Sequence, residues 1–145
     1  MAKVNLFFDS FADSEIVGHT IIRLKCGVQL KTPYGWSKPY SGIIDTGAHL
    51  TAIPSSMWEK ISFIQKIGKS KLFGLSKRKE CALQGELAIV TLILIDEMGN
   101  QTPELKLMAF LAETDQIPLI LGFNGLLEKV SLHLDYAHAI AYIEE

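Results

Sequence analysis

The stretch Ile43-Ile44-Asp45-Thr46-Gly47-Ala48 carries the strongest structural signal in this sequence. Two apolar residues lead into an aspartate, a threonine and a glycine, and residues 40–45 have the apolar, β-branched character of a buried strand. Aspartate and glycine both favour tight turns. We therefore predict a strand that ends at Asp45 and presents its carboxylate on a tight loop.

The rest of the chain is also typical of a β protein, because short runs of Val, Ile, Leu and Phe alternate with turn residues. The predicted features are two strands in 17–30, a loop at 32–39, strands at 87–95, 105–111 and 118–122, a turn at 96–100 and a closing hairpin over 132–143. Short helices are predicted at 54–61, where Pro54 suits the first helical position, and at 123–129. The expected fold class is all-β with one or two short helices.

Length and composition limit the organisation of the chain. A length of 145 residues fits a single domain spanning residues 1–145, with a hydrophobic content of 48% to build its core. The formal net charge of -2 indicates neither a nucleic-acid partner nor an anionic membrane partner. The longest apolar run, 87–95, is far shorter than the roughly 20 residues of a membrane-spanning helix. Residues 1–11 lack the pattern of a secretory signal, so a cytoplasmic location is the default expectation.

No metal or other cofactor is expected. Cys26 and Cys81 have neither metal-ligand spacing nor the density of a disulfide framework, and we expect them to be buried thiols. His19, His133 and His138 do not form a metal-binding pattern.

A second motif lies near the C-terminus. Ile120-Leu121-Gly122 repeats the pattern of two apolar residues before a turn residue, and the predicted second helix follows it. Because Asp45-Thr46-Gly47-Ala48 comes first along the chain and this motif follows near the C-terminus, the chain resembles the retropepsin-like aspartic proteases over about 17–143. The resemblance implies a retropepsin-like closed β-barrel, which is the acid protease fold, and the activity of an aspartic endopeptidase.

The chemistry of that activity needs two carboxylates. Hydrolysis of a peptide bond without a metal or a covalent nucleophile requires one group to take a proton from water and another to give one to the substrate. Two close carboxylates that share one proton do both. The chain has one Asp-Thr-Gly, and the nearest rival acid, Asp135, sits in a predicted hairpin turn where aspartate is normally structural. We therefore predict a two-fold symmetric homodimer in which Asp45 meets its own image.

The neighbours of Asp45 have roles that the resemblance implies. Thr46 would hydrogen-bond across the dimer interface, Gly47 would permit close approach of the substrate backbone, and Ala48 would be small for the same reason. Each residue also has a purely local interpretation. Thr46 would be a turn-forming hydroxyl, Gly47 a turn residue with positive φ, and Ala48 a small residue that only fills space.

The resemblance also implies a substrate-covering flap at 72–83, where Gly74, Leu75 and Ser76 would contact an extended peptide substrate. Seven of the 14 Lys and Arg residues fall between Lys60 and Lys79. This charge is interpreted as a solvated hairpin or, alternatively, as a means of steering an acidic substrate.

Two positions depart from the viral members of the family. His49 and Phe123 stand where those enzymes commonly have an ion pair near the dimer interface, which leaves the strength of the dimer open. The C-terminal strand, 139–143, is expected either to join an intersubunit sheet or to be an ordinary edge strand. The alternative function is a non-catalytic dimerisation or peptide-binding module that keeps the retropepsin-like barrel, since fold alone does not establish activity. A more distant alternative is a monomeric small-ligand β-barrel.

Overall fold

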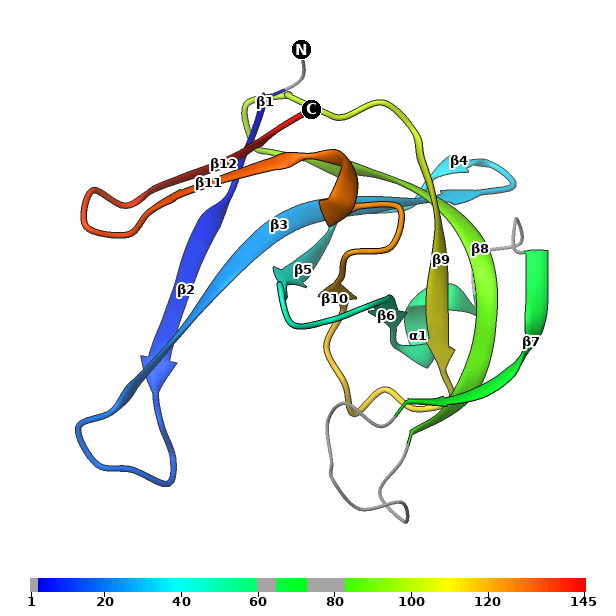
Figure 1. Ribbon diagram of the computed structural model, residues 1–145, viewed down its shortest axis with the longest axis horizontal. Coiled ribbons are helices and arrows are strands. Elements are labelled where there is room, and N and C mark those ends of the chain that lie inside the picture. The colour runs from blue at the N-terminus through cyan, green and yellow to red at the C-terminus, as the bar shows by residue number, and fades with distance from the viewer. Residues whose placement is uncertain (1–2, 60–64, 73–82) are drawn as a thin grey trace.

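The computed structural model describes residues 3–59, 65–72 and 83–145, and strands dominate it (Figure 1). The elements are β1 (Lys3–Asn5), β2 (Phe7–Ala12), β3 (Thr20–Thr32), β4 (Gly35–Trp36), β5 (Tyr40–Ile44), β6 (Thr51–Ile53), α1 (Ser55–Trp58), β7 (Gln65–Leu72), β8 (Leu83–Ile95), β9 (Leu105–Ala112), β10 (Ile120–Leu121), the 3-10 helix η2 (Leu127–Lys129), β11 (Ser131–Asp135) and β12 (Ile140–Glu144). The prediction of an all-β fold with short helices is confirmed. None of the helices in the described ranges is long and apolar enough to cross a lipid bilayer.

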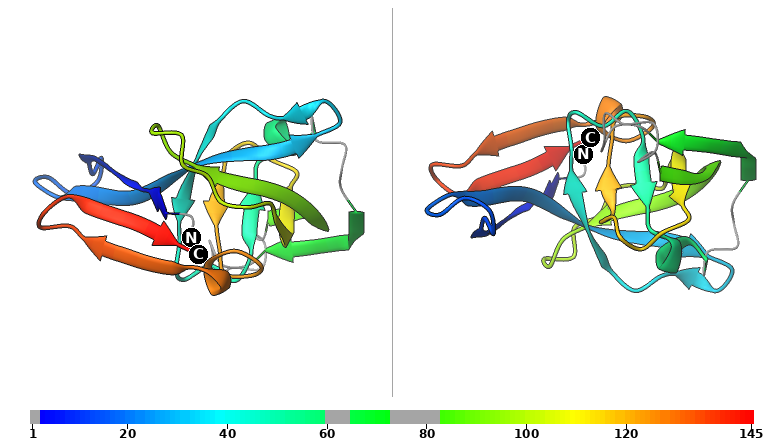
Figure 2. Two further views of the ribbon diagram at one scale, coloured as in Figure 1. Left: turned by 90° about the horizontal axis from the view of Figure 1, so that it is seen from above. Right: turned by 90° about the horizontal axis from the view of Figure 1, so that it is seen from below.

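Most strands belong to one nine-stranded sheet in the order β2-β3-β5-β10-β6-β9-β8-β7, with β4 attached to β3. Because β8 also pairs with β3, the sheet curls round until it nearly closes (Figure 2). Closure takes place at Gly27, which pairs with Ile95, and a Cβ at Gly27 would lie 2.8 Å from the Ile95 carbonyl oxygen. Glycine is therefore required where the two long strands meet.

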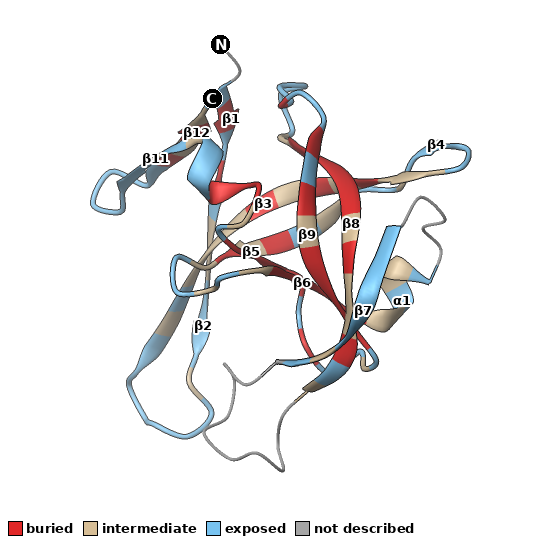
Figure 3. Cartoon of the chain, turned by 45° about the vertical axis from the view of Figure 1, so that its right-hand side comes forward, coloured by how far each residue is buried: buried red, intermediate tan, exposed pale blue. Residues whose placement is uncertain are grey.

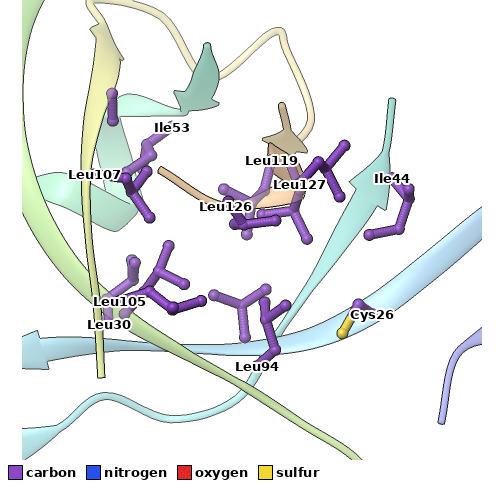
Figure 4. Packing of buried hydrophobic residues seen from close by; sticks show 14 of the residues in the cluster. Cys26, Leu30, Ile44, Ile53, Leu94, Leu105, Leu107, Leu119, Leu126 and Leu127 are labelled. Carbon is purple, nitrogen blue, oxygen red and sulfur yellow. The ribbon is translucent and has the colours of Figure 1, made fainter. Parts of the chain in front are cut away.

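The interior of this sheet holds the main hydrophobic core. Alternate residues of each strand point inward, as the two-residue period of a strand requires. From β8 and β9 these are Ala88, Val90, Leu92, Leu94, Leu105, Leu107, Ala109 and Leu111, all of them buried (Figure 3). Leu30, Leu94 and Leu105 lie close together in this core, and Leu119, Leu126 and Leu127 cover it from the C-terminal part of the chain (Figure 4). The core fixes the strand ends from which the candidate site is built.

A separate three-stranded sheet has the order β1-β12-β11. The C-terminal strand β12 is its central strand, because β12 pairs with β1 on one edge and with β11 on the other. The expectation of an ordinary edge strand is therefore wrong. That this strand joins an intersubunit sheet stays a prediction, and such a sheet would have to extend from β1 or β11. The pairing with β1 was missed because Lys3–Asn5 is too short to show a strand pattern.

Other local predictions had mixed outcomes. The strand at 40–45, the turn at 96–100 and the closing hairpin are confirmed within one or two residues. Residues 17–30 hold one strand rather than two, because Val17 lies in the turn before β3. The predicted loop at 32–39 includes the two-residue strand β4, and the helix predicted at 123–129 is a turn followed by η2.

The helix α1 is fixed from outside its own segment. Pro54 occupies its N-cap position, and the Ser56 N–H donates to the Asp115 carboxylate at 2.7 Å. This bond and those from the Ser55 and Ser56 hydroxyls lower the pKa of Asp115. Trp58 ends the helix, donates its indole N–H to the Ala112 carbonyl oxygen at 2.7 Å and packs against the main hydrophobic core.

Candidate active site

Asp45 is the first residue after β5, as predicted, and its side chain starts a tight turn. The Gly47 N–H donates to Asp45 Oδ1 at 2.9 Å, and the Ala48 N–H donates to the Asp45 carbonyl oxygen at 3.1 Å. The first bond is an Asx turn and the second closes a β-turn. Within the described part of the chain, Asp45 Oδ2 accepts no hydrogen bond. One carboxylate oxygen thus fixes the loop while the other remains available.

The loop that follows Asp45 wraps round the second sequence motif. β10 lies between β5, to which it is parallel, and β6, to which it is antiparallel. The Asp45 N–H donates to the Leu121 carbonyl oxygen at 3.1 Å, and the Phe123 N–H donates to the Ala48 carbonyl oxygen at 3.1 Å. The two motifs, more than 70 residues apart in sequence, therefore form one hydrogen-bonded unit.

Gly122 is the closest point of approach between the two motifs. A Cβ at this position would overlap the Leu50 carbonyl oxygen and would lie 2.9 Å from that of Ala48. Both of these atoms belong to the backbone and cannot move aside easily. Only glycine fits here, which explains why the second motif ends in this residue.

Thr51 is a structural residue of the site that sequence reasoning missed. It is fully buried, and its Oγ1 accepts the Gly122 N–H at 3.1 Å. Asn124 was missed as well, and its Oδ1 accepts the Met108 N–H at 3.2 Å. Both side chains bind backbone groups of segments distant in sequence, so the only available signal was a polar residue at the edge of an apolar run.

The residues next to Asp45 differ from their local interpretations. Gly47 does not have a positive φ, so that interpretation is wrong. A Cβ at Gly47 would instead lie 3.3 Å from Asp45 Oδ1 and press on the carboxylate. Thr46 is exposed, and its hydroxyl makes no hydrogen bond to residues 3–59, 65–72 or 83–145. The Thr46 hydroxyl is thus free to bind a group from outside the chain.

His49 and Phe123 are brought together by the backbone of the two motifs. The Asn124 N–H donates to the His49 carbonyl oxygen at 3.0 Å, next to the bond between Phe123 and Ala48. Both side chains are exposed, Phe123 to 40%. An aromatic ring and an imidazole thus lie on the surface beside the Asp45 loop.

An apolar row crosses the sheet and leads to Asp45. Cross-strand partners join Leu87 to Phe110, Phe110 to Ala52, Ala52 to Ile120, and Ile120 to Ile43. Partners in a sheet lie on the same face, and residues two apart along a strand share a face. The row therefore lies on the face of β5 that continues from Ile43 to Asp45.

Ala48 packs against this row together with Leu83 and Leu87. All three are half-buried, whereas Phe110 beneath them is almost fully buried. The expectation that Ala48 lies near bound substrate stays a prediction, but its contacts place it at the rim of an apolar surface beside the carboxylate.

The two strands that lead into the expected flap are paired. β7 and β8 are antiparallel, with Leu72 opposite Leu83 at their ends. The predicted substrate-contacting residues Gly74, Leu75 and Ser76 lie outside the described residues, as does Cys81. Their roles remain predictions, whereas Cys26 is buried as expected, and burial raises the pKa of its thiol to about 12.

The lysines of β7 point away from the site. A bulge between Lys66 and Gly68 places Lys66, Lys69 and Lys71 opposite Ala88, Glu86 and Gln84, which are alternate residues of β8 and share one face. Leu83 and Leu87, which pack against the same buried cluster as Ala48, lie on the other face. Lys66 Nζ also pairs with Glu86 Oε2 at 3.3 Å. Because these lysines are exposed and lie on the opposite face from Leu83 and Leu87, the arrangement favours a solvated hairpin over direct contact of these lysines with substrate.

Asp135, the rival acid, has a structural role. It lies at the end of β11, where its Oδ1 accepts the His138 N–H at 3.2 Å and its Oδ2 lies 2.7 Å from His138 Nδ1. Its place in the hairpin turn agrees with the prediction. In the described ranges, no three His, Cys, Asp or Glu side chains come together as ligands for a metal ion.

Comparison with known proteins does not assign a family to this geometry. No protein-family model matches the chain, and no curated protein matches it.

Proposed function

We propose that the protein is an aspartic endopeptidase with a retropepsin-like barrel that acts as a homodimer. The observation that carries the proposal is the Asp45 carboxylate, which has one oxygen held by the Gly47 N–H and the other without a hydrogen-bond partner among the described residues. Asp45 follows β5 beside the apolar row that Ala48 borders, so the carboxylate oxygen without a donor in the described structure would lie next to an extended substrate. In the proposed reaction Asp45 takes a proton from the attacking water.

The second carboxylate comes from an identical chain in this proposal. A lone carboxylate cannot both accept the water proton and protonate the scissile amide in one step. Asp135 is engaged with His138. Two copies of Asp45 on a two-fold axis would share one proton and divide the two tasks. Thr46, whose hydroxyl is exposed and unbound in the described structure, would hydrogen-bond across that axis.

Exposed apolar side chains support self-association. Two hairpins, β2–β3 and β11–β12, project from the side of the sheet on which β5 ends (Figures 1 and 2). They carry the exposed hydrophobic side chains Phe7, Phe11, Ile22, Leu134, Tyr136 and Ile140. The hairpins also touch, because the rings of Phe8 and Tyr136 meet edge to face at 5.0 Å. By the strand register, Phe7 and Phe11 share one face of the β2–β3 hairpin and Ile22 lies on the other, so apolar side chains on both faces are available for contact with a second copy.

The interlocked loop explains how such a site would stay rigid. Bonds from Asp45, Gly122 and Phe123 to the opposite motif fix the aspartyl loop before any partner or substrate binds. A pre-positioned carboxylate needs little reorganisation in the transition state. The proposed substrate is an extended peptide that lies between the aspartyl loops and the hairpin ends of β7 and β8.

Cleavage kinetics of the full chain test the proposal. A mixture of unstructured peptides is incubated with the protein from acidic to neutral pH, and products are followed by mass spectrometry. We expect cleavage whose rate per subunit rises with protein concentration, because dilution dissociates the dimer. A folded protein that cleaves no peptide at any of these pH values contradicts the proposal and assigns the chain to the non-catalytic binding or dimerisation modules.

A further inference from the structure

The apolar row beside Asp45 has a floor and a rim. Phe110 and Ile120 form the floor and are only 1% and 8% exposed. The half-buried side chains Ala48, Leu83 and Leu87 pack against the buried cluster that contains Phe110 and Ile120, and they form the rim. A peptide side chain placed next to the Asp45 carboxylate would meet this rim first.

The ring of Phe110 fills the space next to Gly85 in this floor. Its Cζ and Cε1 atoms lie 2.6 Å and 3.0 Å from the place where a Cβ at Gly85 would be. The ring therefore lies across β8 at the one residue that has no side chain, between Leu83 and Leu87 on the same face. A Cβ at position 85 would also overlap the backbone carbonyl oxygen of Leu111, so Gly85 is required both by the neighbouring strand and by the ring of Phe110.

We propose that Phe110 is a specificity-determining residue that limits the substrate to a small side chain beside the cleaved bond. The inference rests on the proposed endopeptidase function and names its substrate class, which is extended peptides with alanine, serine or another small residue where the chain passes Ala48. A close-packed floor leaves no space for a long side chain to enter. A large side chain would have to displace the rim residues Leu83 and Leu87, whereas a small one rests on them.

Peptides that differ in one residue test this inference. In an otherwise fixed sequence, the residues on either side of the cleaved bond are changed in turn to Ala, Val, Leu and Phe, and kcat/KM is measured for each. For the wild type we expect a strong preference for Ala at one of these two positions. A difference of about tenfold or more between Ala and Leu is expected, since each methylene that finds no space is selected against.

Replacing Phe110 by a smaller side chain should weaken the preference for a small substrate residue. In Phe110→Leu the space beneath the rim grows, so the ratio of kcat/KM for the Leu peptide to that for the Ala peptide should rise about tenfold. Phe110→Ala should raise it further if that variant stays folded. Leu92→Ala is the matched control, because Leu92 is fully buried in the main core, away from the row. That control loses stability as well but should keep the wild-type ratio.

The outcomes separate this inference from the function on which it rests. If the wild type cleaves the peptides but prefers large residues, or if folded Phe110→Leu keeps the wild-type ratio, the role of Phe110 is wrong and the endopeptidase function stands. If the wild type cleaves none of the peptides while Phe110→Leu and the wild type are equally folded, the function itself fails and the inference falls with it.

Discussion

Two aspartates in this molecule follow long or buried strands and start glycine-containing turns, yet they differ in what surrounds them. Asp96, after β8, accepts hydrogen bonds from the N–H groups of Asn5, Met98 and Asn100 and from the side-chain amides of Asn5 and Asn100, at 2.8 to 3.0 Å. Asp45, after β5, accepts one bond, from Gly47. Asp96 is saturated and ties β1 to the end of β8, whereas Asp45 keeps an oxygen without a partner in the described structure.

The difference shows how an aspartate used for structure is told apart from one kept for chemistry. Both residues look like turn formers in the sequence, and both do form turns. The number of donors that reach each carboxylate separates them, because a carboxylate that accepts many hydrogen bonds is strongly held in its charged form. This distinction is wrong if substitutions of Asp45 and Asp96 have the same effects on stability and on peptide cleavage.

The largest effect is expected for Asp45→Asn. Asparagine keeps an oxygen that can accept the Gly47 N–H, so the loop should fold as before and the free energy of unfolding should change by less than about 0.5 kcal/mol. Peptide cleavage should fall by about 10³-fold or more, because the amide cannot exchange a proton with water. Urea unfolding and cleavage rates measured on the same preparation check both parts. Retained cleavage would remove Asp45 from the chemistry.

Asp96→Ala should have the opposite signature. The donors of Asn5, Met98 and Asn100 lose their shared acceptor, and the unfolding free energy should fall by about 2 kcal/mol. Cleavage per folded molecule should stay at the wild-type level, because Asp96 lies in the turn between β8 and β9 and binds β1. Urea unfolding provides the stability, and cleavage normalised to the folded fraction provides the activity. An Asp96→Ala protein that is stable but inactive would contradict the claim that Asp96 has only a structural role.

The pH dependence of stability should single out Asp96. Its partial burial raises its pKa, but the hydrogen bonds from Asn5, Asn100 and Met98 outweigh burial and lower the pKa overall. A carboxyl group whose pKa is lowered by folding stabilises the protein above its unfolded pKa of about 3.9, and this contribution is lost as the pH falls through the folded pKa. The stability difference between the wild type and Asp96→Asn should therefore be full at neutral pH and shrink in acid. Urea unfolding over a pH series measures it, and a constant difference would contradict the assignment.

The smallest effect is expected at Cys26. Burial raises the pKa of its thiol to about 12, and the negative charge of Asp96 adds to the shift. At pH 8 about one thiol in 10⁴ is ionised, so alkylation in the folded state should be very slow. Asp96→Asn removes the nearby charge and should speed alkylation modestly, whereas Asp45→Asn should not. Alkylation rates of Cys26 in a Cys81→Ser background provide the measurement.

Local sequence patterns were sufficient for the strand that ends at Asp45, for the Asp96 turn and for the C-terminal hairpin. Each depends on an apolar run followed by residues that favour turns, which is information carried within a few positions. Local sequence patterns did not predict that β10 pairs with β5 and β6, because β10 is distant from both in sequence. Its order in the chain only suggested that the two motifs belong together.

Features that depend on distant partners were missed. Residues 17–30 were predicted as two strands, whereas β3 is one long strand that pairs with β8 from Gly27 onward. Thr51 gave no signal because its partner, the Gly122 N–H, lies 71 positions along the chain. The number of donors at Asp96 could not be foreseen either, since Asn5 reaches it across 91 positions.

The central claim is that one chain supplies half of the acid pair, and a mixing experiment tests it most directly. Wild-type protein is mixed with an equal amount of Asp45→Asn protein under conditions that allow subunits to exchange, and cleavage is compared with that of the wild type alone. If each site needs Asp45 from two chains, activity should fall to about half, because half of the wild-type subunits now pair with the inactive variant. Activity that stays unchanged on mixing, with exchange demonstrated, would contradict the claim.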